Sequence, residues 1–203
     1  MKTVEVKKGI LERNQENADL LRSIFYQNRI FVMNLVSSPG SGKTSLLEKV
    51  LPIVKENYNI LVIEGDLQTE NDAERVRKTG VEAIQINTGG ACHLEAVNIL
   101  KVLKGYDLTK IDCIIIENVG NLVCPSSFDL GEDLKVLLIS TTEGEDKPIK
   151  YPSMVRVSSV LVVNKLDLIP YVNFDVEKAI TYAIGVNNKL EIFKTSCFTG
   201  EGI

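Results

Sequence analysis

The sequence has little histidine and cysteine, no long apolar run and no block of like charge. Among 203 residues there are one histidine and four cysteines. No apolar run approaches the ~20 residues of a membrane-spanning helix, and residues 1–10 lack the apolar segment of a secretory signal. We therefore expect a cytoplasmic protein with no membrane partner.

Charge of both signs is dispersed along the chain. It carries 23 basic and 27 acidic residues, which gives a formal net charge of −4. Neither sign forms the basic or acidic block that binds a polyanion or an anionic membrane surface. We therefore expect no nucleic-acid partner.

The four cysteines do not suit a disulfide framework, because the cytosol keeps thiols reduced. Cys113 lies in the apolar run 112–118, where a small buried side chain suits a strand. Cys92, Cys124 and Cys197 lie near expected loops. Each of these three requires its own explanation.

The apolar residues predict a single α/β domain. A hydrophobic fraction of 44% over this length is enough for one core. Apolar spacing over 10–28 predicts an amphipathic helix. Seven short apolar runs rich in β-branched residues then predict strands buried on both faces, at 30–36, 59–65, 82–86, 112–118, 134–141, 159–164 and 189–195.

Helical patterns lie between most of these runs, at 43–56, 70–78, 94–104 and 175–185. Strands that alternate with helices imply right-handed crossovers and a mostly parallel sheet covered on both faces. We predict a P-loop NTPase domain over 30–203, with an N-terminal helix over 1–29 packed on it.

The segment SSPGSGKT at 37–44 follows a predicted strand and opens a predicted helix, as a phosphate-binding loop requires. Gly40 and Gly42 allow backbone N–H groups to face phosphate oxygens. Lys43 would bind the β- and γ-phosphates, and Thr44 would offer its hydroxyl to Mg²⁺. The nucleotide-binding residues expected in this loop are Pro39, Gly40, Ser41, Gly42, Lys43, Thr44 and Ser45.

The motif NKLD at 164–167 closes another predicted strand and favours GTP over ATP. Asp167 can accept from the N1–H and 2-amino groups of guanine, Asn164 would project beside it, and the Lys165 stem would lie along the base. The segment 195–202 would complete the pocket through Ser196 and, by its position, Cys197. A turn-and-cap role is the alternative for so short a match.

Acidic residues at two strand ends fit roles beside Mg²⁺. Asp66 and Glu117 could hold metal-bound waters, and the Gly120 amide could contact the γ-phosphate. Glu64 is a competing acid. The candidate catalytic residues are Lys43, Asp66, Glu117 and Gly120, and the candidate magnesium ligands are Thr44, Asp66 and Glu117.

Cys92, His93 and Cys124 are candidates for a second metal site. Thiolate and imidazole suit Ni²⁺, Zn²⁺ or copper, and two loops would supply the three ligands. The spacing lacks the period of a zinc finger, so a role in the core or in helix capping is the alternative. Each ligand loop follows one of the segments expected to sense the γ-phosphate.

The motifs together resemble the HypB family, GTPases that help insert nickel into nickel–iron hydrogenase. The resemblance covers nearly the whole chain and is carried by SSPGSGKT, TGGACH, ENVGNLVCP, EGEDKPIKYP, NKLD and TSCFTGEG. It implies a slow GTPase, a nickel or zinc site at Cys92, His93 and Cys124, and a nucleotide-dependent homodimer that shares this site. It also implies delivery to a hydrogenase maturation factor and the hydrogenase large subunit.

The chain departs from the family in two places. It lacks the N-terminal cysteine motif or histidine-rich tract of many members, so we expect no separate nickel site of that kind. It stops at Ile203, where the family normally continues into a helix. Lys147, within EGEDKPIKYP, is a candidate for reaching the nucleotide or a partner subunit.

Other interpretations remain open from the sequence. The chain could insert nickel into another enzyme such as urease, or be a metal-binding module without catalysis. A small-molecule P-loop kinase is a further alternative, but it needs arginines over the phosphates. Arg75 and Arg77 lie instead on a predicted surface helix.

Overall fold

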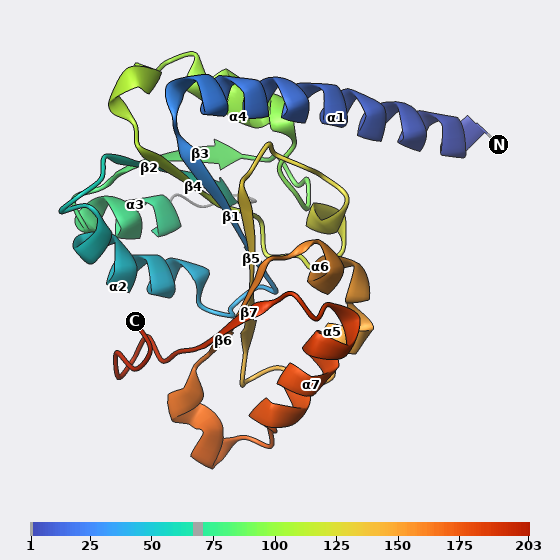
Figure 1. The fold of residues 1–203 in the computed structure, drawn as a ribbon, viewed down its shortest axis with the longest axis vertical. Helices are drawn as coiled ribbons and strands as arrows, with labels where there is room; N and C mark the ends of the chain where they lie inside the picture. Colours follow the sequence, from blue (N-terminus) through green and yellow to red (C-terminus); the bar gives the residue numbers. More distant parts are fainter. Residues whose placement is uncertain (1, 67–70) are drawn as a thin grey trace.

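A computed structural model describes residues 2–66 and 71–203, and side chains from residue 9 onward within these ranges. The chain folds as a single α/β domain with a central sheet (Figure 1). None of its described helices is both long enough and apolar enough to cross a bilayer.

Seven strands form one sheet within the described residues, and every neighbouring pair is parallel. The order is β3-β2-β4-β1-β5-β6-β7, which confirms the predicted P-loop NTPase architecture. Each predicted run matches one strand to within two residues at either end: β1 Phe31–Ser37, β2 Ile60–Asp66, β3 Glu82–Asn87, β4 Cys113–Glu117, β5 Leu134–Ser140, β6 Val160–Asn164 and β7 Glu191–Lys194.

Helices cover both faces of this sheet. The helices are α1 Lys2–Asn28, α2 Lys43–Val54, α3 Asn71–Lys78, α4 Ala96–Leu103, α5 Lys147–Lys150, α6 Pro152–Val157 and α7 Val176–Val186. On one face, Leu51 of α2 and Val76 of α3 pack with buried side chains of the sheet. On the other face, α1 and α4 cover the half that contains β2 and β4, and α6 and α7 cover the half that contains β6 (Figure 1).

The long helix α1 lies along α4 and extends beyond the body of the domain (Figure 1). Its Ala18, Leu21 and Phe25 are buried against the core, whereas Ile10 and Leu20 are exposed. The C-terminal part of α1 is therefore the part that packs on the domain.

Two features differ from the predictions. Helix α4 begins at Ala96 instead of Leu94, because the N–H groups of Leu94 and Glu95 donate to the side chains of Asn118 and Asn98. The short helices α5 and α6 were not predicted, since prolines begin or interrupt them and neither spans two full turns. Three 3-10 helices, Leu108–Lys110, Cys124–Ser126 and Leu166–Tyr171, complete the described structure.

Strand β7 forms one edge of the sheet and is short and poorly buried. It has four residues, of which three are exposed, including both its charged ends, Glu191 and Lys194. Lys194 forms an ion pair with Glu177 of α7. The edge is thus short and charged.

Candidate nucleotide and metal sites

The carboxyl ends of the strands gather the predicted nucleotide residues. Strand β1 lies in the centre of the sheet, between β4 and β5. The phosphate loop leaves β1 and leads directly into α2, so that the loop ends at a helix N-terminus, which favours anions. Glu117 ends the neighbouring β4 and Asp66 ends β2, next to β4.

The phosphate loop has the backbone expected of it. Gly40 and Gly42 have φ of 73° and 102°, in the left-handed region that favours glycine. Ser37, which stands where such loops usually begin with glycine, is the last residue of β1 and needs no positive φ. The Lys43 ammonium lies 3.1 Å from the Ser37 hydroxyl, which accepts its hydrogen bond.

Thr44 and Glu117 form the core of the candidate magnesium site. The Thr44 hydroxyl donates to Glu117 Oε1 at 2.9 Å, and Lys43 Nζ lies 3.8 Å from the same oxygen. Glu117 Oε2 is buried without a hydrogen-bond partner among the described residues. A hydroxyl next to an unsatisfied carboxylate suits Mg²⁺, which prefers hard oxygen ligands.

Glu64, the competing acid, lies beside Glu117 and is 2% exposed. The two residues are paired in register between β2 and β4. Burial, together with the charge of Glu117, raises the pKa of Glu64 to about 10. Burial also raises the pKa of Glu117, against the opposing effects of Lys43 and Thr44. Glu64 is therefore the carboxyl that keeps a proton, and Glu117 is the one that faces the phosphate loop.

The candidate γ-phosphate sensor Gly120 lies against the phosphate loop itself. A Cβ atom at Gly120 would lie 2.9 Å from the Pro39 Cα, so only glycine allows this approach. Asp66, at the end of β2, is half-buried, and its carbonyl accepts a hydrogen bond from the Thr88 N–H. The segment after it, expected to respond to the γ-phosphate, begins with 67–70, which lies outside the described residues.

Four of the five predicted base-binding residues, all except Ser196, line one cavity of about 350 Å³. Asp167 Oδ1 accepts from the Ser196 hydroxyl, and the Cys197 thiol is half-buried at the same place. Lys165 donates to the Gly40 carbonyl at 2.7 Å. The cavity is lined by Gly42, Ser45, Glu48, Lys49, Asn164, Lys165, Asp167, Leu168, Cys197 and Phe198.

Asn164 has a different geometry from the expected one beside the base. It is 1% exposed, and its amide donates to the Ser41 carbonyl at 3.1 Å while accepting from Thr195. The side chain thus connects the phosphate loop to the base loop. A Cβ at Gly42 would lie 2.6 Å from its Nδ2 atom, which explains glycine at that position.

Glu143 and Lys147 form a contact with the phosphate loop that sequence reasoning found only in part. Glu143 Oε1 accepts from the Ser41 hydroxyl at 2.5 Å. Lys147 Nζ lies 3.2 Å from Glu143 Oε2 and donates to the Ser38 hydroxyl at 3.1 Å. Lys147 was a candidate from its motif, whereas Glu143, the first residue of the same motif, was not selected.

The structure brings the three predicted metal ligands together. Cys92 and His93 lie in the loop before α4, and Cys124 begins the 3-10 helix Cys124–Ser126. One ligand atom from each residue lies within 4.8 Å of the other two. The Cys92 and Cys124 sulfurs are 2.9 Å apart and both thiols are free. Two thiols and an imidazole form a soft donor set that suits Ni²⁺ or Zn²⁺.

The surroundings of His93 favour the neutral imidazole that binds metal. Burial lowers the pKa of His93, with Glu95 opposing. Its Nε2 atom is buried without a hydrogen-bond partner among the described residues. The ring packs on Phe128, with the ring centroids 3.8 Å apart. The hydrogen bond with Cys92, aided by burial, raises the pKa of Cys124.

Two asparagines connect this cluster to the segment that carries Glu117 and Gly120. Asn121 Nδ2 donates to the Cys92 carbonyl at 3.2 Å. Asn118 Oδ1 accepts from the Leu94 N–H at 3.3 Å, directly after His93. Sequence reasoning did not select either residue. Their place within ENVGN, next to the predicted nucleotide residues, was the available signal.

Comparison with known proteins places the chain among nucleotide-binding proteins. A family model described as the CobW/HypB/UreG nucleotide-binding domain matches residues 31–194. Hydrogenase maturation factor HypB of Escherichia coli (strain K12) is 51% identical over 200 residues, which cover 98% of this chain and 69% of that protein. The corresponding factor of Azotobacter vinelandii is 48% identical, with coverages of 98% and 66%. The chain thus spans about two thirds of the length of these relatives.

Solved structures agree with this assignment. HypB from Helicobacter pylori, solved in complex with nickel, is 42% identical with a TM-score of 0.85, over 92% of this chain and 87% of that one. HypB from Archaeoglobus fulgidus is 37% identical with a TM-score of 0.88, over 94% and 93%. A signal recognition particle protein from Aeropyrum pernix, at 15% identity and a TM-score of 0.61, shares the fold alone. On both sequence and structure, the chain belongs to the HypB family of hydrogenase maturation factors.

Proposed function

We propose that the chain is a GTP-hydrolysing metallochaperone that binds nickel, or zinc at the same ligands, and delivers nickel during hydrogenase maturation. One observation supports this most directly: the cluster of Cys92, His93 and Cys124 is hydrogen-bonded to the segment that follows Glu117. Metal and nucleotide would therefore act on the same two loops.

Hydrolysis would rest on positioning and charge. Lys43 and the loop amides would hold the β- and γ-phosphates, and Asp167 with Ser196 would select guanine. Mg²⁺, held through Thr44, Asp66 and Glu117, would neutralise charge on the phosphate oxygens. Arg75 forms ion pairs with Glu48 and Asp72, so it is not a free arginine over the phosphates as a kinase would need.

Loss of the γ-phosphate would free the Gly120 segment from the phosphate loop. The asparagines at 118 and 121 would then move the loop of Cys92 and His93 relative to Cys124, which would weaken metal binding. Such a change requires different metal affinities in the two nucleotide states, because a ligand with equal affinities shifts no equilibrium.

A homodimer completes this proposal. Three protein ligands leave a four-coordinate metal site unfinished, and a second copy in the GTP-bound state would supply the remaining ligands. A hydrogenase maturation factor and the hydrogenase large subunit would then receive the metal. The solved complex of the Helicobacter pylori relative with nickel supports nickel as the cargo.

The test measures nickel affinity of the chain with GDP and with a non-hydrolysable GTP analogue. We expect unequal affinities, with Cys124→Ala weakening both and the matched Cys113→Ala change weakening neither. Lys43→Ala should abolish GTP turnover. Equal affinities would contradict the coupling, and turnover that survives in Lys43→Ala would contradict the assigned phosphate site.

A second recipient has one supporting observation. A relative from Helicobacter hepaticus, 44% identical over 181 residues, is named a hydrogenase/urease maturation factor. Nickel transfer from the loaded chain to apo-urease and to apo-hydrogenase large subunit, each with its accessory proteins, separates the two recipients. Transfer to urease alone would replace the hydrogenase assignment.

A further inference from the structure

The two metal-bearing loops come from distant parts of the chain, and neither lies in a strand. Cys92 and Cys124 are separated by 32 positions, yet their sulfurs are 2.9 Å apart. Loops, including one that contains only a single 3-10 turn, depend on side-chain contacts for their placement. Interactions beyond the three ligands must therefore fix this separation.

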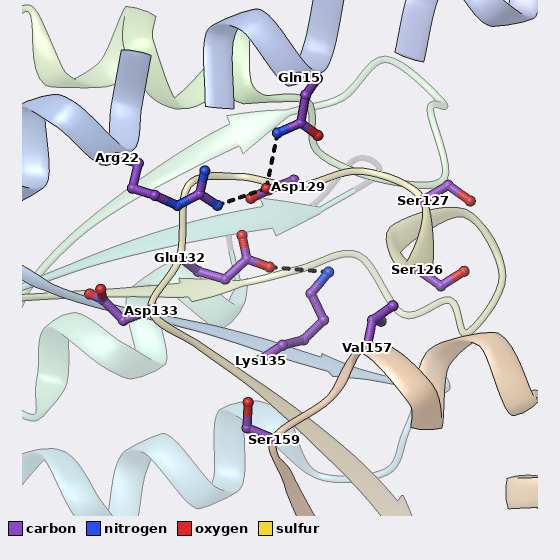
Figure 2. Close-up of a pocket in the computed structure, with 10 residues that line it drawn as sticks. All are labelled: Gln15, Arg22, Ser126, Ser127, Asp129, Glu132, Asp133, Lys135, Val157 and Ser159. Carbon is purple, nitrogen blue, oxygen red and sulfur yellow. Dashed lines mark hydrogen bonds and ion pairs between the residues drawn. The ribbon is translucent and has the colours of Figure 1, made fainter. Parts of the chain in front are cut away.

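Lys135 of β5 provides the first of these interactions. Its side chain is 8% exposed and lines the same pocket as Ser126 and Ser127, which follow Cys124 in the chain (Figure 2). The ammonium donates to the Pro125 carbonyl at 3.1 Å and lies 3.1 Å from Glu132 Oε1. Pro125 follows Cys124 directly, so the hydrogen bond holds the backbone of the metal-bearing turn.

A buried chain of side chains continues from Glu132 to the other loop. Glu132 Oε1 also accepts from Asn34 Nδ2 at 3.1 Å, and Asn34 Oδ1 accepts from Asn118 Nδ2 at 3.3 Å. Asn118 in turn accepts from the N–H of Leu94, the residue after His93. Asn34 and Asn118 are 0% and 1% exposed. The chain thus connects Pro125 to Leu94 through the interior.

Asn14 of α1 forms a separate bridge between the same loops. Its Oδ1 accepts from the Ala96 N–H and its Nδ2 donates to the Asp129 carbonyl, both at 2.8 Å. Gln15 and Arg22 of the same helix reach the Asp129 carboxylate (Figure 2). The loops are therefore joined at two levels, through the sheet and through α1.

A buried ion pair is poorly explained by stability alone, because apolar residues of similar volume are often as stable or more stable. We propose that Lys135 is a positioning residue for the metal site, acting through Glu132, Asn34 and Asn118 to set Cys124 against Cys92 and His93. The expected effect on nickel binding rests on the proposed function. The expected effect on the separation of the Cys92 and Cys124 thiols is independent of it.

The test compares Lys135→Met with wild type and with Lys189→Met, the same change at an exposed lysine. The first readout needs no metal: it is the equilibrium constant for forming the Cys92–Cys124 disulfide against oxidised glutathione, which yields two reduced glutathiones. We expect a decrease of about tenfold, the effect of one lost charge-assisted hydrogen bond. Nickel affinity should fall by a similar factor, with unchanged GDP affinity.

A folded Lys135→Met variant with wild-type disulfide and nickel equilibria would overturn the proposal. If that variant does not fold, the double variant Lys135→Met with Glu132→Gln also removes the Glu132 charge that the single change leaves buried and unpaired. A wild-type disulfide constant in the double variant would then overturn the proposal, and a decreased constant would support it. Wild type that binds no nickel would contradict the proposed function, while the disulfide constants still test the role of Lys135.

Discussion

Glu64 and Glu117 show how neighbouring carboxyl groups of the same type acquire different roles. Both are buried, with Glu117 at the end of β4 and Glu64 two residues before the end of the paired strand β2. Glu117 has Lys43 and Thr44 beside it, whereas Glu64 has mainly the negative charge of Glu117. The carboxyl group of Glu64 therefore stays protonated, whereas that of Glu117 faces the candidate magnesium site.

Glu64→Gln should stabilise the nucleotide-free protein increasingly as pH rises. The folded pKa of about 10 lies above the ordinary value of 4.5, so the stability from the bound proton is complete below pH 4.5 and is lost as pH approaches 10. Glutamine mimics the protonated form at every pH. At pH 8.5 we expect a rise of at least ~2–4 °C in thermal midpoint, and near pH 4.5 no difference.

Thermal unfolding across this pH range, with exposed Glu56→Gln as the control, checks the expectation. A stabilisation of equal size at both ends of the range would mean that Glu64 does not hold its proton in the folded state.

The sequence was sufficient to select side chains that lie in a short motif and have a recognisable ligand chemistry. Cys92, His93 and Cys124 were selected by their chemistry, and the structure brings their ligand atoms together. Asn14, Asn34 and Lys135 could not be selected, because their contacts join positions ten to more than 100 residues apart and leave no local pattern. Buried polar residues of this kind become visible only when the fold places them.

The strands were predictable because burial on both faces leaves continuous apolar runs, which tolerate errors of one or two residues at their ends. Short helices were not predictable for the opposite reason. In α5 and α6, one or two turns carry too few positions for a helical period. At α4, a long-range hydrogen bond from the Leu94 N–H to Asn118 Oδ1 helps to set where the helix begins.

Helix α1 packs closely against Gly131, in the loop between the 3-10 helix Cys124–Ser126 and β5. This residue has φ of 78°, and a Cβ there would lie 2.8 Å from Leu21 Cβ and 2.9 Å from the Ala18 carbonyl. Gly131→Ala should therefore cost about 2–4 kcal/mol, from the left-handed backbone and the overlap with α1. Denaturant unfolding measures this loss, and limited proteolysis should show faster cleavage in α1.

Gly9→Ala in the exposed part of α1 is the matched control, because a Cβ there meets nothing within 4 Å. Alanine favours a helix over glycine by ~1 kcal/mol, so this change should not destabilise. Equal losses in the two variants would show that the contact at Gly131 does not hold α1.

In the complete fold, the candidate guanine, phosphate and metal sites all lie at the loops that follow the carboxyl ends of the strands. The parallel sheet causes this arrangement, since the carboxyl ends of all its strands lie on the same side of the domain. Candidate sites for two ligands of unrelated chemistry are thereby placed on loops that contact one another.

The mass in solution should depend on both ligands if a second copy completes the metal site. We expect the monomer mass with GDP and the dimer mass with a GTP analogue and nickel, measured by sedimentation or light scattering. Cys124→Ala should remove the contribution of nickel and keep that of the nucleotide. The four states to compare are GDP and GTP analogue, each with and without nickel. The same mass in all four would contradict a ligand-dependent dimer.

The short charged strand β7 has a consequence for how copies of this chain can meet. Exposed sheet edges recruit further strands unless they are short, charged or covered, and β7 has the first two properties with Lys194 paired to Glu177. Growth of the sheet into a continuous fibre is thereby disfavoured at this edge. The proposed homodimer would then form through the ligand-bearing loops and not through this edge, so that release of a ligand could reverse it.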